Sequence, residues 1–237
     1  MNTPDARTPD HSPLVYLVDD DDAVRDALAL LLRSVGLRSV GFDDPQAFLA
    51  QLSASAIGCV VLDIRMPGIS GLDVLGRLAA QSDLPVVMLT GHANVDLCRR
   101  AFKGGAMEFL QKPVDDDVFL DAVQAAVRTH IASREKLAVT QAAADRLARL
   151  SGREHEVLAR IVQGMSNKEI AREFDLSPRT VETYRANVFA KLEADSLAQL
   201  IRQYATLLDY PGALPSVTLR RRASSRAYTA RRAFWPH

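Results

Sequence analysis

The chain has 237 residues, 48% hydrophobic and 24% charged, which is typical of an ordinary globular protein with one or two domains. No apolar run reaches the ~18 residues that a membrane span requires, and residues 1–13 lack the apolar core of a signal peptide. We therefore expect a cytoplasmic protein with no membrane partner, and two distant cysteines exclude a disulfide framework.

The net charge of zero conceals a gradient along the chain. Residues 14–128 contain 16 acidic and 10 basic side chains, whereas residues 151–208 contain eight of each. Between them, residues 129–150 hold four basic and two acidic side chains, and residues 209–237 hold six arginines and one acid. This asymmetry predicts segments with different roles.

Short apolar runs alternate with helical patterns between residues 14 and 128. The runs are LVYLV (14–18), LRSVGF (37–42), CVVL (59–62), PVVML (85–89) and AMEFL (106–110). Strand–helix alternation with short connections is typical of a parallel sheet that helices cover on both faces. We predict an α/β domain of the flavodoxin-like, doubly wound type, with five parallel strands in the order 2-1-3-4-5.

The fifth helix of this domain is expected to begin near Asp115 and to continue past Arg128. Residues 118–150 contain neither glycine nor proline, so nothing in the sequence ends the helix there. A heptad pattern is interrupted by polar residues such as His130 and Arg134, which argues against a strong coiled coil. We predict that residues 129–150 form a partly packed helical linker between two domains.

Only helical patterns follow Ser151. The stretch SNKEIAREFDLSPRTVETYRANV predicts a helix, a tight turn and a second helix, for which Ser177 is a good N-cap and Pro178 a good first residue. We predict an all-α, four-helix helix-turn-helix domain over residues 151–208. Residues 1–13 and the basic tail, 209–237, are expected to be disordered. The tail's arginines could be merely solvated, clamp DNA phosphates or bind a protein.

Polar groups gather at one edge of the predicted sheet. Asp19 and Asp20 follow the first strand and Asp63 ends the neighbouring third strand, and such close like charges cannot all ionise unpaired. A carboxylate-rich oxygen site suits Mg²⁺. Thr90 ends the fourth strand and Lys112 follows the fifth, which adds a hydroxyl and an ammonium. Helix capping explains any single aspartate here, but the whole group predicts a carboxylate nucleophile toward a phosphoryl group.

Residues 14–128 resemble the receiver domain of two-component response regulators. The similarity lies in VDDD after the first strand, LDIRMPGISG around Asp63, TGH after the fourth strand and EFLQKP at the end of the fifth. The resemblance implies that Asp63 is the phosphoacceptor and that Lys112-Pro113 is a cis peptide bond. The implied Mg²⁺ ligands are Asp19, Asp20, Asp63 and the backbone carbonyl of Arg65. The implied phosphoryl-binding and switch residues are Thr90, Gly91, Phe109 and Lys112.

Residues 151–208 resemble the LuxR-type DNA-binding domain of NarL/FixJ response regulators, most clearly in SNKEIA and SPRTVE. By this resemblance the second helix of the helix-turn-helix enters the major groove. The residues implied to face base edges are Glu182, Thr183 and Ala186, and those implied to contact phosphates are Lys168, Arg179, Thr180, Arg185 and Lys191. Tyr184 and Phe189 depart from the family, which usually has His and often Met there. A domain with zero net charge binds DNA weakly alone, so we expect two copies on a symmetric site.

These observations predict a phosphorylation-dependent DNA-binding transcription regulator of a two-component system. A sensor histidine kinase would phosphorylate Asp63, and the protein would then dimerise through its fourth helix, fifth strand and fifth helix and bind promoter DNA. We do not expect an enzyme, because phosphatases that form an aspartyl-phosphate typically carry a second Asp where this chain has Arg65. The alternative is an interaction module or phosphate sink without promoter-specific DNA binding, against which the helix-turn-helix argues.

Overall fold

The computed structural model describes residues 12–53 and 55–208. The chain divides into two units, Met1–Ala138 and Val139–His237. Apart from residues 12 and 13, the segments expected to be disordered lie outside the described residues. None of the helices in the described part is both long enough and apolar enough to span a bilayer.

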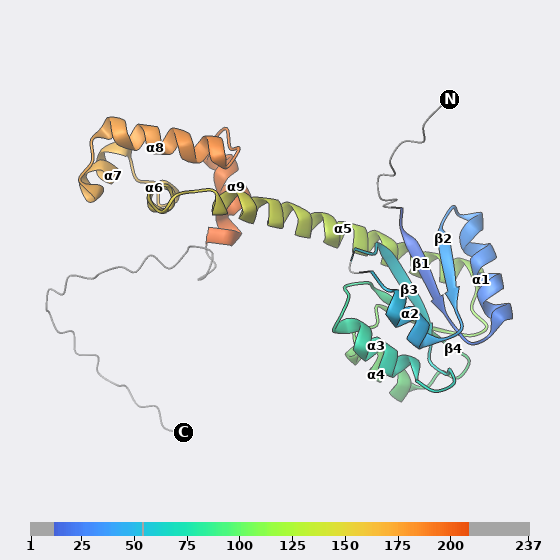
Figure 1. Ribbon diagram of the computed structural model, residues 1–237. Helices are drawn as coiled ribbons and strands as arrows, with labels where there is room; N and C mark the ends of the chain where they lie inside the picture. The colour runs from blue at the N-terminus through green and yellow to red at the C-terminus, as the bar shows by residue number, and fades with distance from the viewer. Residues whose placement is uncertain (1–11, 54, 209–237) are drawn as a thin grey trace, which may run out of the picture. The chain divides into compact units, whose positions relative to one another are not determined.

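Five parallel strands form one sheet in the N-terminal unit (Figure 1), in the predicted order β2-β1-β3-β4-β5. The strands are β1 (Leu14–Val18), β2 (Arg38–Phe42), β3 (Gly58–Asp63), β4 (Val86–Thr90) and β5 (Glu108–Gln111). Strands β3 and β4 are buried along their whole length, which explains their nearly unbroken apolar sequences. The register pairs Val18 with Leu62 and Asp63 with Leu89, so β1, β3 and β4 present their carboxyl ends at one edge.

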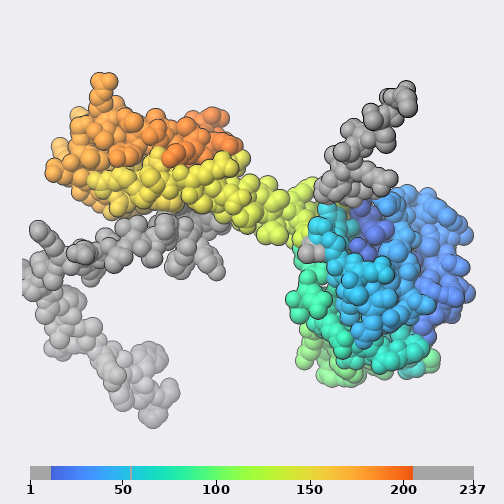
Figure 2. Space-filling view, in the orientation of Figure 1, coloured from blue at the N-terminus to red at the C-terminus, as the bar shows by residue number. Residues whose placement is uncertain are grey.

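Helices cover both faces of this sheet. The helices are α1 (Asp22–Ser34), α2 (Pro45–Gln51), α3 (Gly71–Ala79), α4 (Val95–Lys103) and α5 (Asp116–Ala148). The side chains of Asp21 and Asp44 accept backbone N–H groups at the starts of α1 and α2, which fixes where these helices begin. In the space-filling view the blue-to-green side chains of this unit form a continuous packed surface (Figure 2).

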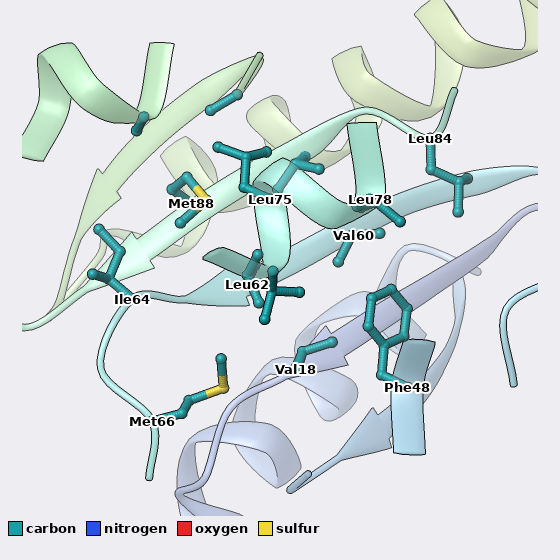
Figure 3. Packing of buried hydrophobic residues seen from close by; sticks show 14 of the residues in the cluster. Val18, Phe48, Val60, Leu62, Ile64, Met66, Leu75, Leu78, Leu84 and Met88 are labelled. Atoms are coloured by element: carbon teal, nitrogen blue, oxygen red, sulfur yellow. The ribbon is translucent and has the colours of Figure 1, made fainter. Parts of the chain in front are cut away.

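Two apolar layers hold the helices to the sheet. On one face, Phe48 of α2 and Leu75 of α3 belong to the same buried cluster as Val60 and Leu62 of β3 (Figure 3). On the other face, α1 and the first part of α5 pack against the opposite side chains of the strands. The buried residues of this second layer that come from the two helices are Leu28, Leu32, Phe119, Val123, Ala126 and Val127. The central strands β3 and β4 are therefore desolvated, whereas the edge strands β2 and β5 carry exposed residues.

Helix α5 contributes to the cores of both units. Val123 and Val127, which occupy heptad positions in the sequence, are buried against the sheet. The polar heptad position His130 is also buried: its Nδ1 accepts the Gly58 N–H at 3.1 Å, and its Nε2 lies 3.3 Å from a carboxylate oxygen of Asp83. In the second half of α5, Ala143 and other residues join the core of the C-terminal unit. The interrupted heptad pattern of α5 therefore reflects packing of the helix within each unit and not a coiled coil.

Four further helices make up the C-terminal unit, as the apolar stripes predict. They are α6 (Gly152–Val162), α7 (Asn167–Phe174), α8 (Pro178–Lys191) and α9 (Leu197–Leu208). Ser151 and Ser166 start α6 and α7 with capping boxes, and Ser177 caps α8. Asp175 adopts a left-handed conformation (φ 53°) that ends α7 and turns the chain toward α8. The turn thereby sets α8 as the second helix of a helix-turn-helix.

Candidate functional site

Asp63 lies at the carboxyl end of β3 and is only 5% exposed. Its Oδ2 accepts the backbone N–H of Arg65 at 2.6 Å, and its Oδ1 lies 3.0 Å from the Nζ of Lys112. Both carboxylate oxygens therefore have a donor, which fixes the orientation of the group at the edge of the sheet. These two donors offset part of the free-energy cost of placing a carboxylate at the end of an apolar strand.

Lys112 connects the ends of three strands. Its Nζ donates to Oδ2 of Asp19 at 2.5 Å while it also faces Asp63, so one ammonium bridges the carboxylates that follow β1 and end β3. Its backbone N–H donates to the Thr90 carbonyl at 2.8 Å, which ties the ends of β4 and β5. The peptide bond to Pro113 is cis, as the resemblance implied. Asp19, Asp63, Thr90 and Lys112 thus converge as the sequence predicts.

Burial raises the pKa of the Asp63 carboxyl above its ordinary value. The hydrogen bond and charge of Lys112 and the Arg65 N–H act in the opposite direction without cancelling it, and the nearby Asp19 charge raises the pKa further. For Lys112, burial alone would lower the pKa, but its bonds to Asp19 and Asp63 outweigh burial and raise it. The lysine stays charged, and the folded protein holds the Asp63 carboxylate at an energetic cost.

Four consecutive aspartates, residues 19–22, have different partners. Asp19 accepts from Lys112, and the Asp21 side chain accepts the Ala23 and Val24 N–H groups at the start of α1. Asp22 forms an ion pair with Arg25. Among the described residues, no side chain or amide donates to the exposed carboxylate of Asp20. Asp20 therefore differs from the other three aspartates, each of which has at least one carboxylate oxygen in a hydrogen bond or ion pair.

The side chains of this group include the oxygen donors that Mg²⁺ prefers. Within the described part of the chain, no three acidic, His or Cys side chains are arranged as a metal-binding cluster, and the Lys112 ammonium pairs with both Asp19 and Asp63. Three carboxylates and one ammonium leave a formal charge of −2 (−3 and +1), and every predicted ligand atom is an oxygen. Hard oxygen donors with this charge fit Mg²⁺.

The remaining predicted switch residues lie beside this group. Thr90 is buried at the end of β4, and its Oγ1 accepts the His92 N–H at 3.3 Å. Gly91 follows it at the exposed end of the strand. Phe109 of β5 is half-buried against the apolar layer of the sheet and also lines a groove of about 580 Å³ beside α4. A rearrangement near Thr90 therefore has a neighbouring aromatic side chain that reaches the surface.

The face of α8 proposed from the sequence is accessible. Arg179, Glu182, Thr183 and Ala186 are exposed, and so is Lys168 on α7. Thr180 and Arg185 are half-buried, and the Thr180 hydroxyl is 2.7 Å from that of the N-cap Ser177. On the opposite side of the helix, Val181 and Val188 are buried, with Tyr184 and Phe189 partly buried against the same core.

Two contacts made by residues in or near the candidate sites escaped the sequence analysis. Lys191, expected to contact phosphate, donates to the buried carboxylate of Glu154 at 2.7 Å, so its ammonium already has a protein partner. The pairing joins the end of α8 to the start of α6, a separation of 37 residues that no local pattern reveals. The second is made by Arg25, which contacts the backbone carbonyl of Asp19 and the carboxylate of Asp22. An aspartate and an arginine three apart on α1 were a local signal for it.

Two family models match the chain. The model of the response regulator receiver domain matches residues 15–124, and that of bacterial regulatory proteins of the luxR family matches residues 148–204. The two matched segments correspond to the α/β unit and to the helix-turn-helix unit with the end of α5.

Similar proteins match across both segments. The transcriptional regulatory protein FixJ of Bradyrhizobium diazoefficiens is 47% identical over 189 residues, which cover 79% of this chain and 92% of that protein. The response regulator protein TmoT of Ectopseudomonas mendocina is 36% identical over 201 residues, covering 84% and 91%. Among solved structures, the response regulator StyR matches with a TM-score of 0.75 at 38% identity, covering 82% of this chain and 99% of StyR.

The buried charge of Asp63 generates a prediction about stability. Since the folded-state pKa of Asp63 is raised, its contribution favours folding at low pH and is lost as the pH rises through that pKa. Asp63→Asn should therefore raise the unfolding midpoint of this unit at pH 7.5 by a few degrees. The gain should vanish below the ordinary pKa of a carboxyl, where Asp63 is neutral in both states. Calorimetric unfolding across pH checks this, with the exposed Asp26→Asn as the control that should show no such trend.

Proposed function

Because this chain belongs to the NarL/FixJ family of two-component response regulators and is a phosphorylation-dependent, DNA-binding transcription regulator, we propose that Asp63 is the residue that accepts the phosphoryl group. The observation that carries the proposal is the Lys112 ammonium held between the Asp63 and Asp19 carboxylates at 3.0 and 2.5 Å. Among the aspartates at this edge, Asp63 alone ends a strand of the sheet and sits beside both Lys112 and Thr90.

The transfer requires one new bond. A carboxylate oxygen of Asp63 attacks the phosphorus atom, an O–P bond forms, and the bond from phosphorus to the donor's leaving atom breaks with its electron pair. Lys112 then pairs with the phosphoryl oxygens in place of the Asp63 oxygen, and the Thr90 hydroxyl and Gly91 N–H lie at the neighbouring strand end to donate to them. Because burial destabilises the ionised Asp63 carboxylate, it favours a reaction in which the charge and solvation of this group change.

Asp19, Asp20 and Asp63, with the Arg65 carbonyl, would hold Mg²⁺ at this site. When bound, the cation neutralises charge on the transferring phosphoryl oxygens. Asp19 is already oriented by Lys112, and the exposed Asp20 carboxylate has no donor in the part of the chain that the structure describes. The physiological donor would be a sensor histidine kinase, and the protein would act in the cytoplasm.

We further propose that phosphorylation leads to a homodimer through the groove beside α4. Asn94, Val95, Cys98, Phe102, Phe109 and Gln111 are among the residues that line it. Val95 is 86% exposed and Phe102 47%, which is unusual for apolar side chains that line one groove. Phe109 lies between this surface and the core, so a change near Thr90 would repack the groove. A second copy fits because the zero-charge DNA-binding unit needs a partner on promoter DNA.

The phosphoacceptor proposal predicts complete loss of labelling in one variant. With acetyl phosphate and Mg²⁺, the wild-type chain should gain one phosphoryl group, and Asp63→Asn should gain none because its amide is not a nucleophile. Intact-mass spectrometry measures this, and Asp26→Asn is the matched control that should label like wild type. Labelling of Asp63→Asn at the wild-type rate would show that the acceptor is another residue.

The dimer proposal predicts that a charge in the groove blocks association. Val95→Asp should weaken dimerisation of the protein treated with a phosphate mimic by at least tenfold, because desolvating a carboxylate in an apolar interface is costly even with Arg99 lining the same groove. Leu30→Asp, at an exposed apolar position of α1, should dimerise like wild type. Sedimentation velocity at micromolar concentration measures the masses. An unchanged monomer in the wild-type protein, together with tighter DNA binding, would reject dimerisation as the switch.

Glu182 generates a prediction about base recognition. A carboxylate is unfavourable beside phosphates, and its partner in the major groove is the N4 amino group of cytosine. Glu182→Ala should therefore relax preference at one base pair per half-site by about 1–3 kcal/mol. If Glu182 only interacts with the start of α8, binding should instead rise equally on all sequences. Affinities for a panel of single-base operator variants separate these outcomes, and Asp195→Ala controls for loss of an acidic charge outside α8.

A further inference from the structure

Arg25 is held between the two ends of the acidic run. Its Nη1 donates to the backbone carbonyl of Asp19 at 2.6 Å, and its Nη2 pairs with the carboxylate of Asp22. The Arg25 side chain is 14% exposed, although it belongs to a surface helix, whereas Asp22 is 84% exposed. The guanidinium thus spans the segment that connects β1 to α1.

The carbonyl that Arg25 binds belongs to the peptide group that joins Asp19 to Asp20. A peptide group is planar, so fixing its carbonyl also fixes where the Cα of Asp20 lies. The preceding N–H of Asp19 is held by the Phe42 carbonyl at 3.1 Å, and Oδ1 of Asp19 accepts the Asp21 N–H at 3.1 Å. The N–H, the carbonyl and both carboxylate oxygens of Asp19 therefore each have a partner. The position of the Asp20 backbone depends on the peptide group that Arg25 holds.

Gly41 makes room for this arrangement. It lies on the edge strand β2 opposite Leu17, and its surface is exposed. A Cβ at position 41 would lie 3.4 Å from both Cδ and Nε of Arg25, so the arginine stem crosses the strand at van der Waals distance. A branched side chain there would push the stem away from the Asp19 carbonyl.

We propose that Arg25 is a positioning residue for the Mg²⁺ site. It orients the peptide group between the two ligands Asp19 and Asp20, and it withdraws Asp22 from competition for the cation. The inference rests on the metal site proposed above. The fork of the guanidinium is essential, because a lysine carries the same charge but cannot reach the carbonyl and the carboxylate in the same geometry.

The test is a calorimetric titration of MgCl₂ into the full-length, unphosphorylated chain. Arg25→Lys keeps the charge and removes the fork, and it should weaken Mg²⁺ binding about tenfold, as loss of a partner that orients a metal ligand typically does. Arg33→Lys, the same exchange at an exposed position of α1, should bind like wild type. Gly41→Val should weaken binding in the wild-type background and add nothing in Arg25→Lys, because both changes act through one contact.

Charge and stability are separated by two further measurements. Arg25→Met should also weaken binding, whereas a purely electrostatic role would make it bind Mg²⁺ more tightly, since a nearby positive charge is removed. Unfolding midpoints in EDTA report stability without the metal, and a merely structural role would lower them while leaving Mg²⁺ affinity unchanged. Mg²⁺ affinity of Arg25→Lys within twofold of wild type would overturn the inference.

The proposed metal site has its own control. Asp20→Asn should abolish the binding seen in the wild-type chain. If the wild-type chain bound no Mg²⁺, or if Asp20→Asn bound it equally well, the site itself would be rejected and the role of Arg25 with it. If Asp20→Asn lost binding while Arg25→Lys and Gly41→Val kept it, only the inference about Arg25 would fail.

Discussion

The ammonium of Lys112, shared between the carboxylates of Asp19 and Asp63, is the interaction on which the N-terminal site depends. Two carboxylates at the ends of adjacent buried strands would repel each other, and one cation between them makes the arrangement tolerable. The compensation is incomplete, because burial still raises the pKa of Asp63. The fold thus keeps the Asp63 carboxylate at a cost in stability, as would be expected of a group retained for the proposed phosphoryl transfer.

The parallel sheet is what brings these groups together. Each strand ends at the same edge, and the next helix begins within a few residues, so side chains that follow β1, β3, β4 and β5 meet although they are far apart in the chain. The apolar layers on both faces hold the strands in register and leave the edge as the polar part of the sheet. Phe109 packs against one of these layers and also lines the groove beside α4. It is therefore a side chain in contact with both the apolar layer and the surface groove.

The C-terminal unit presents a DNA-binding helix on a domain in which residues 151–208 have no net charge. Three serine caps and the left-handed Asp175 set the helix boundaries, and buried valines hold α8 against the core with its polar face outward. Lys191 is paired with Glu154, so fewer cations of this unit are available to DNA phosphates than the sequence suggests. Two copies acting together would gain affinity, so the proposed dimer would link the receiver to DNA binding.

Local patterns in the sequence were sufficient for the strand order, the Ser177 N-cap, the helix-turn-helix and the meeting of Asp63, Asp19, Thr90 and Lys112. Each of these depends on periodicity, turn chemistry or the rule that parallel strands end together. Tertiary structure decided the individual partners of the four consecutive aspartates. Their side chains are identical, so each one's partner depends on which donor groups the fold places near it. The same holds for Glu154 with Lys191 and for His130 with Gly58, pairs separated by 37 and 72 residues. A contact between residues so far apart in the sequence depends on how whole helices and strands pack, and local sequence patterns do not predict it.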